Sequence, residues 1–248
     1  MIATSTDYRP PVRQWCIEML TALFLAVIAT AWLEHSSIDL AISQWFYMDD
    51  GQWWIAKDAR LPDWVFYTGP KRLLILLEVY LILAYVYRWY ADRQPKTVVL
   101  SAQRCFSPVA ILSKRELGYL AITMLMIPTV IASLKSVTHV ACPAYLTLFG
   151  GDMPYLPLLE SMAQKIPAKC FPAAHASSGF ALYALAFLPS LTNHRWKIIA
   201  SVTLFAWLMG GYKMAIGDHF FSHTLVSMLL AWAMSAFAAI CGFRRYRN

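Results

Sequence analysis

Apolar residues along this chain gather in long runs that polar stretches separate. Most of the runs approach the roughly 20 residues that a helix needs to cross the hydrocarbon core of a membrane. Glu78 interrupts the second run. The pattern predicts six membrane-spanning helices, at residues 15–33, 73–90, 116–134, 176–191, 198–214 and 220–241. We therefore expect an all-α polytopic membrane protein, with residues 1–248 forming a single domain.

The two longest polar stretches differ in composition. Residues 34–63 are rich in aspartate and tryptophan, which is typical of an interfacial segment that lies in the headgroup region, here with a short helix. Residues 135–171 contain repeated prolines and a pair of adjacent glycines, which predict a loop rather than a long helix. Both stretches fall on the same side of the membrane if the chain crosses it six times.

The composition agrees with a membrane protein, because 59% of the residues are hydrophobic and only 14% are charged. The net charge is +7, and the basic residues lie between the apolar runs. The positive-inside rule then places both termini in the cytoplasm. The basic residues on that side would be Arg9, Arg13, Arg88, Arg93, Lys96, Arg104, Lys114, Arg115, Arg195, Lys197, Arg244, Arg245 and Arg247. No basic face is left over for nucleic acid, so we do not expect nucleic-acid binding.

Ionisable residues gather where four of the predicted helices begin or end on the outer side. Lys135 closes the third helix and Lys213 the fifth, whereas His175 opens the fourth. His219 and His223, four residues apart, would share one face at the head of the sixth helix. Lysines suit phosphate oxygens, and histidine can act as a nucleophile or a general acid. The pattern indicates phosphoryl transfer without a metal or another cofactor.

The same residues resemble the motifs of a known family, the type 2 phosphatidic acid phosphatase superfamily. Its pattern is K-x6-R-P, then P-S-G-H, then S-R-x5-H-x3-D. Lys135 and Pro143 match the first motif, Pro172 and His175 the second, and His219 the histidine of the third. The chain departs from the pattern at several positions. Cys142 and Lys213 stand in place of arginines, Ala173 and Ala174 in place of Ser-Gly, Tyr212 in place of serine and His223 in place of aspartate.

The resemblance covers residues 70–240 and implies a bacterial inner-membrane lipid phosphatase with a periplasmic active site. It implies that His219 attacks phosphorus to form a phosphohistidine and that His175 protonates the leaving oxygen. Lys135 and Lys213 would hold the phosphoryl oxygens, and His223 would support His219. Substrates of this kind are undecaprenyl diphosphate, phosphatidylglycerophosphate, phosphatidic acid and the 1-phosphate of lipid A.

Several alternatives stay open from the sequence. The same site could pass the phosphoryl group to a second lipid, or the chain could be a lipid transporter or lipid-binding protein. Lys71 and Arg72 could touch a lipid phosphate or could be anchors that reach the membrane surface. The expected partners are a lipid phosphate substrate and membrane lipids, with no obligate protein partner.

Five cysteines include no C-x-x-C pair, which argues against zinc. Only Cys142 and Cys170 fall on the outer side, which in a bacterium is oxidising. They flank the first two motifs, which a folded site would bring together. We therefore predict a disulfide between Cys142 and Cys170 that holds Lys135 and His175 in register.

Overall fold

The computed structural model describes residues 10–93 and 105–244. In these ranges five helices are long and apolar enough to cross a membrane. They contain α1 (Val12–Glu34), α4 (Gly69–Ala91), α5 (Lys114–Thr138), α8 (Arg195–Ala215) and α9 (Phe221–Phe243). The described residues contain no β-sheet, only two isolated bridges. The expectation of an all-α, multi-pass membrane protein is confirmed.

The predicted fourth span, residues 176–191, differs from the other five. It begins as α7 (Ala174–Phe180) and continues as a 3₁₀ helix, η5 (Ala181–Phe187). Pro189 ends this segment, because the residue before a proline is driven to extended backbone and Leu188 has φ −75° and ψ 129°. A sixth long helix is therefore not confirmed.

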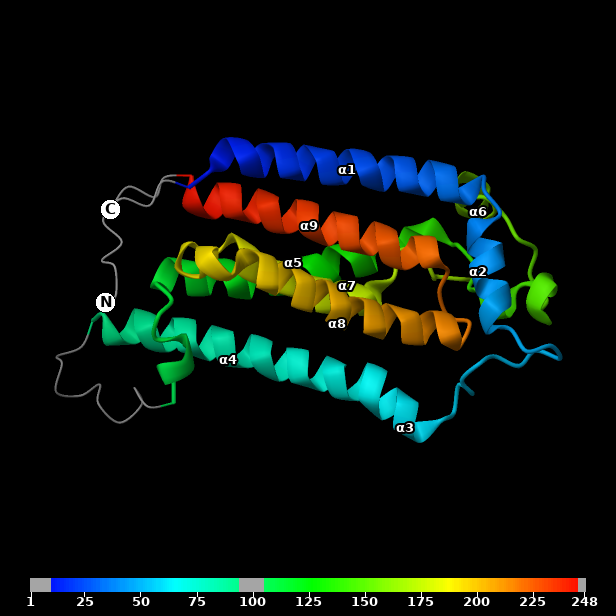
Figure 1. Ribbon diagram of the computed structural model, residues 1–248, viewed down its shortest axis with the longest axis horizontal. Helices are drawn as coiled ribbons and strands as arrows, with labels where there is room; N and C mark the ends of the chain where they lie inside the picture. Colours follow the sequence, from blue (N-terminus) through cyan, green and yellow to red (C-terminus); the bar gives the residue numbers. More distant parts are fainter. Residues whose placement is uncertain (1–9, 94–104, 245–248) are drawn as a thin grey trace.

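The segment from α7 through η5 lies inside the bundle, where it packs against α5, α8 and α9 (Figure 1). Its small residues allow close approach. A Cβ atom added to Gly179 would lie 3.0 Å from both the Cβ of Ala206 and the sulfur of Met209. Trp15, near the start of α1, closes the core at the end where η5 and α9 finish. Its ring centroid lies 5.9 Å from that of Phe187 and 6.2 Å from that of Phe243.

The two ends of the bundle are built differently (Figure 1). The start of α1 and the end of α9 lie at one end, and α2 (Ile38–Phe46), α3 (Arg60–Asp63) and α6 (Leu158–Gln164) lie at the other. Helix α2 is the short helix expected in the interfacial segment, and Trp45 on it is 77% exposed. A π-helical turn, η1 (Trp64–Thr68), joins α3 to α4.

Most basic residues expected in the cytoplasm lie at the end where α1 starts. Arg13, Arg88, Lys114 and Arg195 are at the termini of α1, α4, α5 and α8 there. Five more of the set lie outside the described residues, namely Arg9, Lys96, Arg104, Arg245 and Arg247.

Candidate active site

A cavity of about 600 Å³ opens at the end of the bundle that α2, α3 and α6 cover. Lys135, His175, Lys213 and His219 all line it, so the structure brings these four predicted residues together. They come from the end of α5, the start of α7, the end of α8 and the turn before α9. Cys142, Cys170 and His139 line the same cavity.

The turn between α8 and α9 positions His219. The backbone N–H groups of Asp218 and His219 both donate to the carbonyl of Lys213, at 2.8 and 3.2 Å. Gly217 permits this turn, because its φ is +73° and an added Cβ would lie 2.4 Å from the Trp53 ring. Helix α9 begins at Phe221, one residue after the predicted start, so His219 lies before the helix and does not share a helical face with His223 as expected. Phe220, the residue before the helix, is extended and leaves His219 in the turn.

His223 lies behind His219, away from the cavity. The Nδ1 atoms of the two rings are 3.4 Å apart, so one can donate to the other. His223 is 2% exposed, and the rings of Phe171 and Phe220 pack against it with centroids 5.2 and 5.3 Å away. The role expected for His223 as a support of His219 fits this geometry.

His219 is 5% exposed, and its surroundings disfavour a positive charge. Burial, reinforced by the charges of Lys135 and Lys213, lowers the pKa of His219 to about 3, against a hydrogen bond with the backbone of Cys170 that raises it. The imidazole is therefore neutral at neutral pH and keeps a lone pair, as a nucleophile requires.

Tyr67 of η1 connects His175 with Lys213. Its ring centroid lies 4.3 Å from that of His175, and the Nζ of Lys213 lies 4.0 Å from the Tyr67 centroid. The Nε2 atom of His175 is 3.4 Å from the carbonyl oxygen of Phe66. The π-helical turn therefore orients one histidine and one lysine of the cavity.

Asp218 bridges two lysines at the cavity wall. Its Oδ2 lies 2.9 Å from the Nζ of Lys213, and its Oδ1 lies 2.9 Å from the Nζ of Lys57. Burial alone would raise the pKa of the Asp218 carboxyl, but the two lysines hold it below its ordinary value. Lys57 also lines the cavity, although it belongs to the interfacial segment.

Lys71 and Arg72, proposed from the sequence as phosphate contacts, do not line this cavity. Both are exposed in the first turns of α4. The Nζ of Lys71 lies 5.8 Å from the centroid of Tyr67, on a neighbour of the site. Lys71 therefore lies beside the cavity and not in its lining, near enough for its charge to help lower the pKa of His175.

A disulfide joins Cys142 and Cys170, whose Cα atoms are 5.3 Å apart. Around it, the N–H of Cys170 donates to the carbonyl of Val140 at 3.0 Å, and the hydroxyl of Thr138 donates to the carbonyl of Phe171. These contacts tie the end of α5 to the segment that precedes His175. The disulfide therefore lies where the sequence predicts it, in the cavity wall.

Asp39 of α2 fixes the start of α9. Its Oδ1 accepts a hydrogen bond of 2.9 Å from the N–H of Ser222, which lies between the two histidines. A carboxylate is favourable there because the first N–H groups of a helix have no partner within it. The carboxylate expected at position 223 from the family pattern is thus absent, but another reaches the same turn from α2.

Sequence reasoning missed Lys57, Tyr67 and Asp39, which lie between α1 and α4 and do not belong to the three motifs. Sequence reasoning also passed over Asp218. On a helix, the side chain of Asp218 would point away from that of the adjacent His219. In residues 10–93 and 105–244, no three His, Cys, Asp or Glu side chains gather in a way that could hold a metal ion. The lining of the cavity carries four lysines, Lys57, Lys135, Lys169 and Lys213, and one acid, Asp218.

Fold and geometry together define a multi-pass membrane protein with a cavity that is lined by histidines and lysines and suits a phosphate ester. The sequence model of the PAP2 superfamily matches residues 116–247, and the chain belongs to that family. The resemblance drawn from the motifs is confirmed. Comparison with curated proteins and with solved structures finds no match. Membership suggests phosphatase activity on lipid phosphates.

Proposed function

We propose that this protein hydrolyses the phosphomonoester or diphosphate of a membrane lipid through a phosphohistidine intermediate. The observation that carries the proposal is that His175, His219, Lys135 and Lys213 line one cavity at an end of the bundle. Phosphoryl transfer asks mainly for positioning and for neutralisation of the charge on the transferred group. Two imidazoles and two lysines meet both needs.

In the first step, neutral His219 attacks phosphorus, and the bond from phosphorus to the lipid oxygen breaks. Burial lowers the pKa of His175 to about 4 in the free site, and the negative charge of a bound phosphate raises it again. The protonated His175 then gives its proton to that oxygen, so that the lipid leaves as an alcohol or as a shorter phosphate ester. Lys135 and Lys213 hold the phosphoryl oxygens through charge-assisted hydrogen bonds. Lys213 would exchange its bond to Asp218 for one to phosphate, while Lys57 keeps Asp218 paired.

In the second step, water attacks the phosphohistidine. His175 takes a proton from the water, and the bond between phosphorus and His219 breaks to release inorganic phosphate. This step returns both histidines to their starting protonation states, because the proton lost by His175 in the first step is regained in the second.

His223 supports the nucleophile in this scheme. Because the Nδ1 atoms of His219 and His223 lie 3.4 Å apart, Nε2 is the ring nitrogen of His219 that remains for attack. A neutral His223 that accepts the Nδ1–H of His219 fixes this tautomer and the ring orientation. It would do so without the negative charge that an aspartate brings.

We place the protein in the bacterial inner membrane, with both termini in the cytoplasm and the cavity facing the periplasm. Arg13, Arg88, Lys114 and Arg195 at the opposite end of the bundle support this orientation through the positive-inside rule. A disulfide between Cys142 and Cys170 suits an oxidising compartment. A lipid phosphate of the outer leaflet would then be the substrate.

Phosphate release by the full chain in detergent, from phosphatidic acid, phosphatidylglycerophosphate, undecaprenyl diphosphate and lipid A, tests the proposal. We expect release from at least one of these lipids, in the presence of EDTA, and none from His219→Ala. A rate of phosphate release by His219→Ala within tenfold of the wild-type rate would overturn the assignment of His219. An intact protein that consumes none of the four would overturn the proposed activity.

A further inference from the structure

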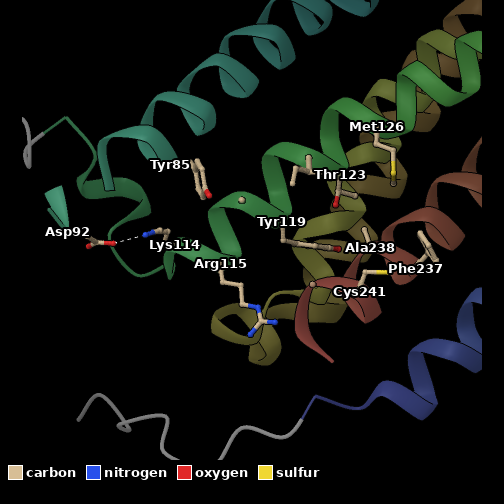
Figure 2. A pocket seen from close by; sticks show the side chains of 13 residues that line it. Tyr85, Asp92, Lys114, Arg115, Tyr119, Thr123, Met126, Phe237, Ala238 and Cys241 are labelled. Carbon is tan, nitrogen blue, oxygen red and sulfur yellow. Dashed lines mark hydrogen bonds and ion pairs between the residues drawn. The ribbon is translucent and has the colours of Figure 1, made fainter. Parts of the chain in front are cut away.

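Figure 2 shows a second large cavity, of about 800 Å³. It is lined by the start of α5 and the end of α9, so it lies at the end of the bundle opposite to His219. We call it the basal groove. It is lined by Tyr85 of α4, by Tyr119, Ile122 and Met126 of α5, and by Phe237 and Ala238 of α9. Its volume is in the range of ligand pockets, about 300–1,000 Å³, and its lining is mostly aromatic and aliphatic.

The basal groove opens toward the membrane and has the length of one leaflet. Ile122 and Phe237 in its walls are 65% and 53% exposed, on helices that span the membrane. Along α5 the lining runs from Lys114 to Met126, a rise of about 18 Å at 1.5 Å per residue. Half of a hydrocarbon core of about 30 Å is about 15 Å. An acyl chain that starts at the helix end would fill the groove as far as the middle of the membrane.

The charged side chains that line the basal groove lie at the end of the groove where α5 starts. Figure 2 shows Lys114 and Asp92 joined there, and Arg115 at the next position of α5. The two basic residues outnumber the one acid. Lys114 and Asp92 are 2.9 Å apart, but their side chains are 40% and 59% exposed. Exposed ion pairs contribute little, so a phosphate can take the place of Asp92 beside Lys114.

The end of α5 that carries these charges is held firmly. Ser113 and Glu116 form a reciprocal cap, with the N–H of Ser113 donating to Glu116 at 2.7 Å and the N–H of Glu116 donating to Ser113 at 3.2 Å. Glu116 also accepts the N–H and the hydroxyl of Ser190, at 2.8 and 2.9 Å. The positions of Lys114 and Arg115 relative to the apolar lining are therefore set by the fold.

We propose that the basal groove binds one anionic phospholipid from the leaflet at this end. The headgroup phosphate lies against Lys114 and Arg115, and one acyl chain lies along Tyr119, Ile122 and Met126. The groove and the cavity of His219 are at opposite ends of the helices, so this lipid is a bound partner and not the substrate. The inference does not depend on the proposed phosphatase activity.

Native mass spectrometry of the full chain in detergent, titrated with phosphatidylglycerol, measures this binding. Phosphatidylglycerol is a phosphodiester without a terminal phosphate, so the proposed activity would not consume it. We expect one bound lipid per chain, and at least about tenfold weaker binding of phosphatidylcholine with the same acyl chains. The variant Lys114→Gln/Arg115→Gln should lose about tenfold in affinity for phosphatidylglycerol, whereas Arg13→Gln, an exposed charge at the same end, should not.

A second variant tests the acyl-chain part of the site and serves if the charge variant does not fold. Ala238→Trp fills the groove from α9 and should also lose bound phosphatidylglycerol. Leu204→Trp, at a position of α8 where the leucine is 65% exposed, should keep it. Equal binding of the two phospholipids, or wild-type affinity in either groove variant, would overturn the proposal.

Discussion

The cavity around His219 and the basal groove are similar in size, about 600 and about 800 Å³, and α5 contributes to both. They differ in where their charges lie. Lys135, Lys213 and His219 line the interior of the first, whereas Lys114 and Arg115 stand only at the mouth of the second. A site that transfers a phosphoryl group needs charge at the reacting atoms, and a site that holds a lipid chain needs an apolar interior.

The two regions also differ in what holds them. Helix packing and one helix cap shape the basal groove. The cavity of His219 needs a disulfide, a turn at Gly217 and a carboxylate from α2. Charged and polar groups inside an apolar bundle are costly unless partners fix them. Substitutions in the cavity of His219 should therefore lower the rate of phosphate release by large factors. Substitutions in the basal groove should leave that rate unchanged.

The sharpest contrast is between histidines at the two ends. His175→Ala should lower kcat by about 10²–10⁴, because the leaving oxygen loses its proton donor. His194→Ala, an exposed histidine near the start of α8, is the matched control and should keep the wild-type rate. Steady-state phosphate release measures both. Equal rates for wild type and His175→Ala would remove His175 from the mechanism.

A smaller loss is expected for the lysines of the cavity. Lys135→Ala or Lys213→Ala removes a charge-assisted contact to the phosphoryl group, which is worth about 1.5–3 kcal/mol, or roughly 10- to 150-fold in kcat/KM. Lys213→Arg should retain activity, since arginine is the usual residue of the family motif at this position. Phosphate release over a range of substrate concentrations gives kcat/KM. An inactive Lys213→Arg would mean that Lys213 has another task.

The disulfide should matter for folding at the first region. Replacing Cys142 and Cys170 by serine removes a cross-link across a sequence separation of 28 residues. The chain-entropy model gives a loss of roughly 3–4 kcal/mol in the free energy of unfolding. Thermal unfolding in detergent should therefore occur at a lower temperature, with Cys105→Ser, an exposed free cysteine, as the unchanged control. Equal unfolding temperatures would contradict a structural role for the cross-link.

How far the sequence leads can be judged from particular segments. The apolar runs predict α1, α4, α5, α8 and α9, because length and hydropathy are local properties. They do not predict η5, where close packing around Gly179 and the proline at 189 decide the backbone. The motifs predict that Lys135, His175, Lys213 and His219 meet. They are silent on Lys57, Tyr67 and Asp39, whose places depend on how residues 35–68 fold over the end of the bundle.

The smallest effect concerns the charge of His219. With a pKa of about 3, its ring should stay neutral from pH 8 to pH 5, and its ring ¹⁵N shifts should stay constant over that range. An unfolded histidine titrates near about 6.5, so the unfolded state binds the proton first. Stability from this residue therefore falls as the pH drops below about 6.5 toward 3. A transition to imidazolium between pH 8 and pH 5 would contradict the buried, neutral nucleophile.

The central claim is that His219 carries the phosphoryl group. Brief reaction of the full chain with a lipid labelled at its terminal phosphate, followed by an alkaline quench and peptide mapping, tests it directly, because phosphohistidine survives base. The account predicts label on the peptide that contains His219, in wild type and not in His219→Ala. Label on another residue, or turnover with no labelled peptide at any time point, would contradict it.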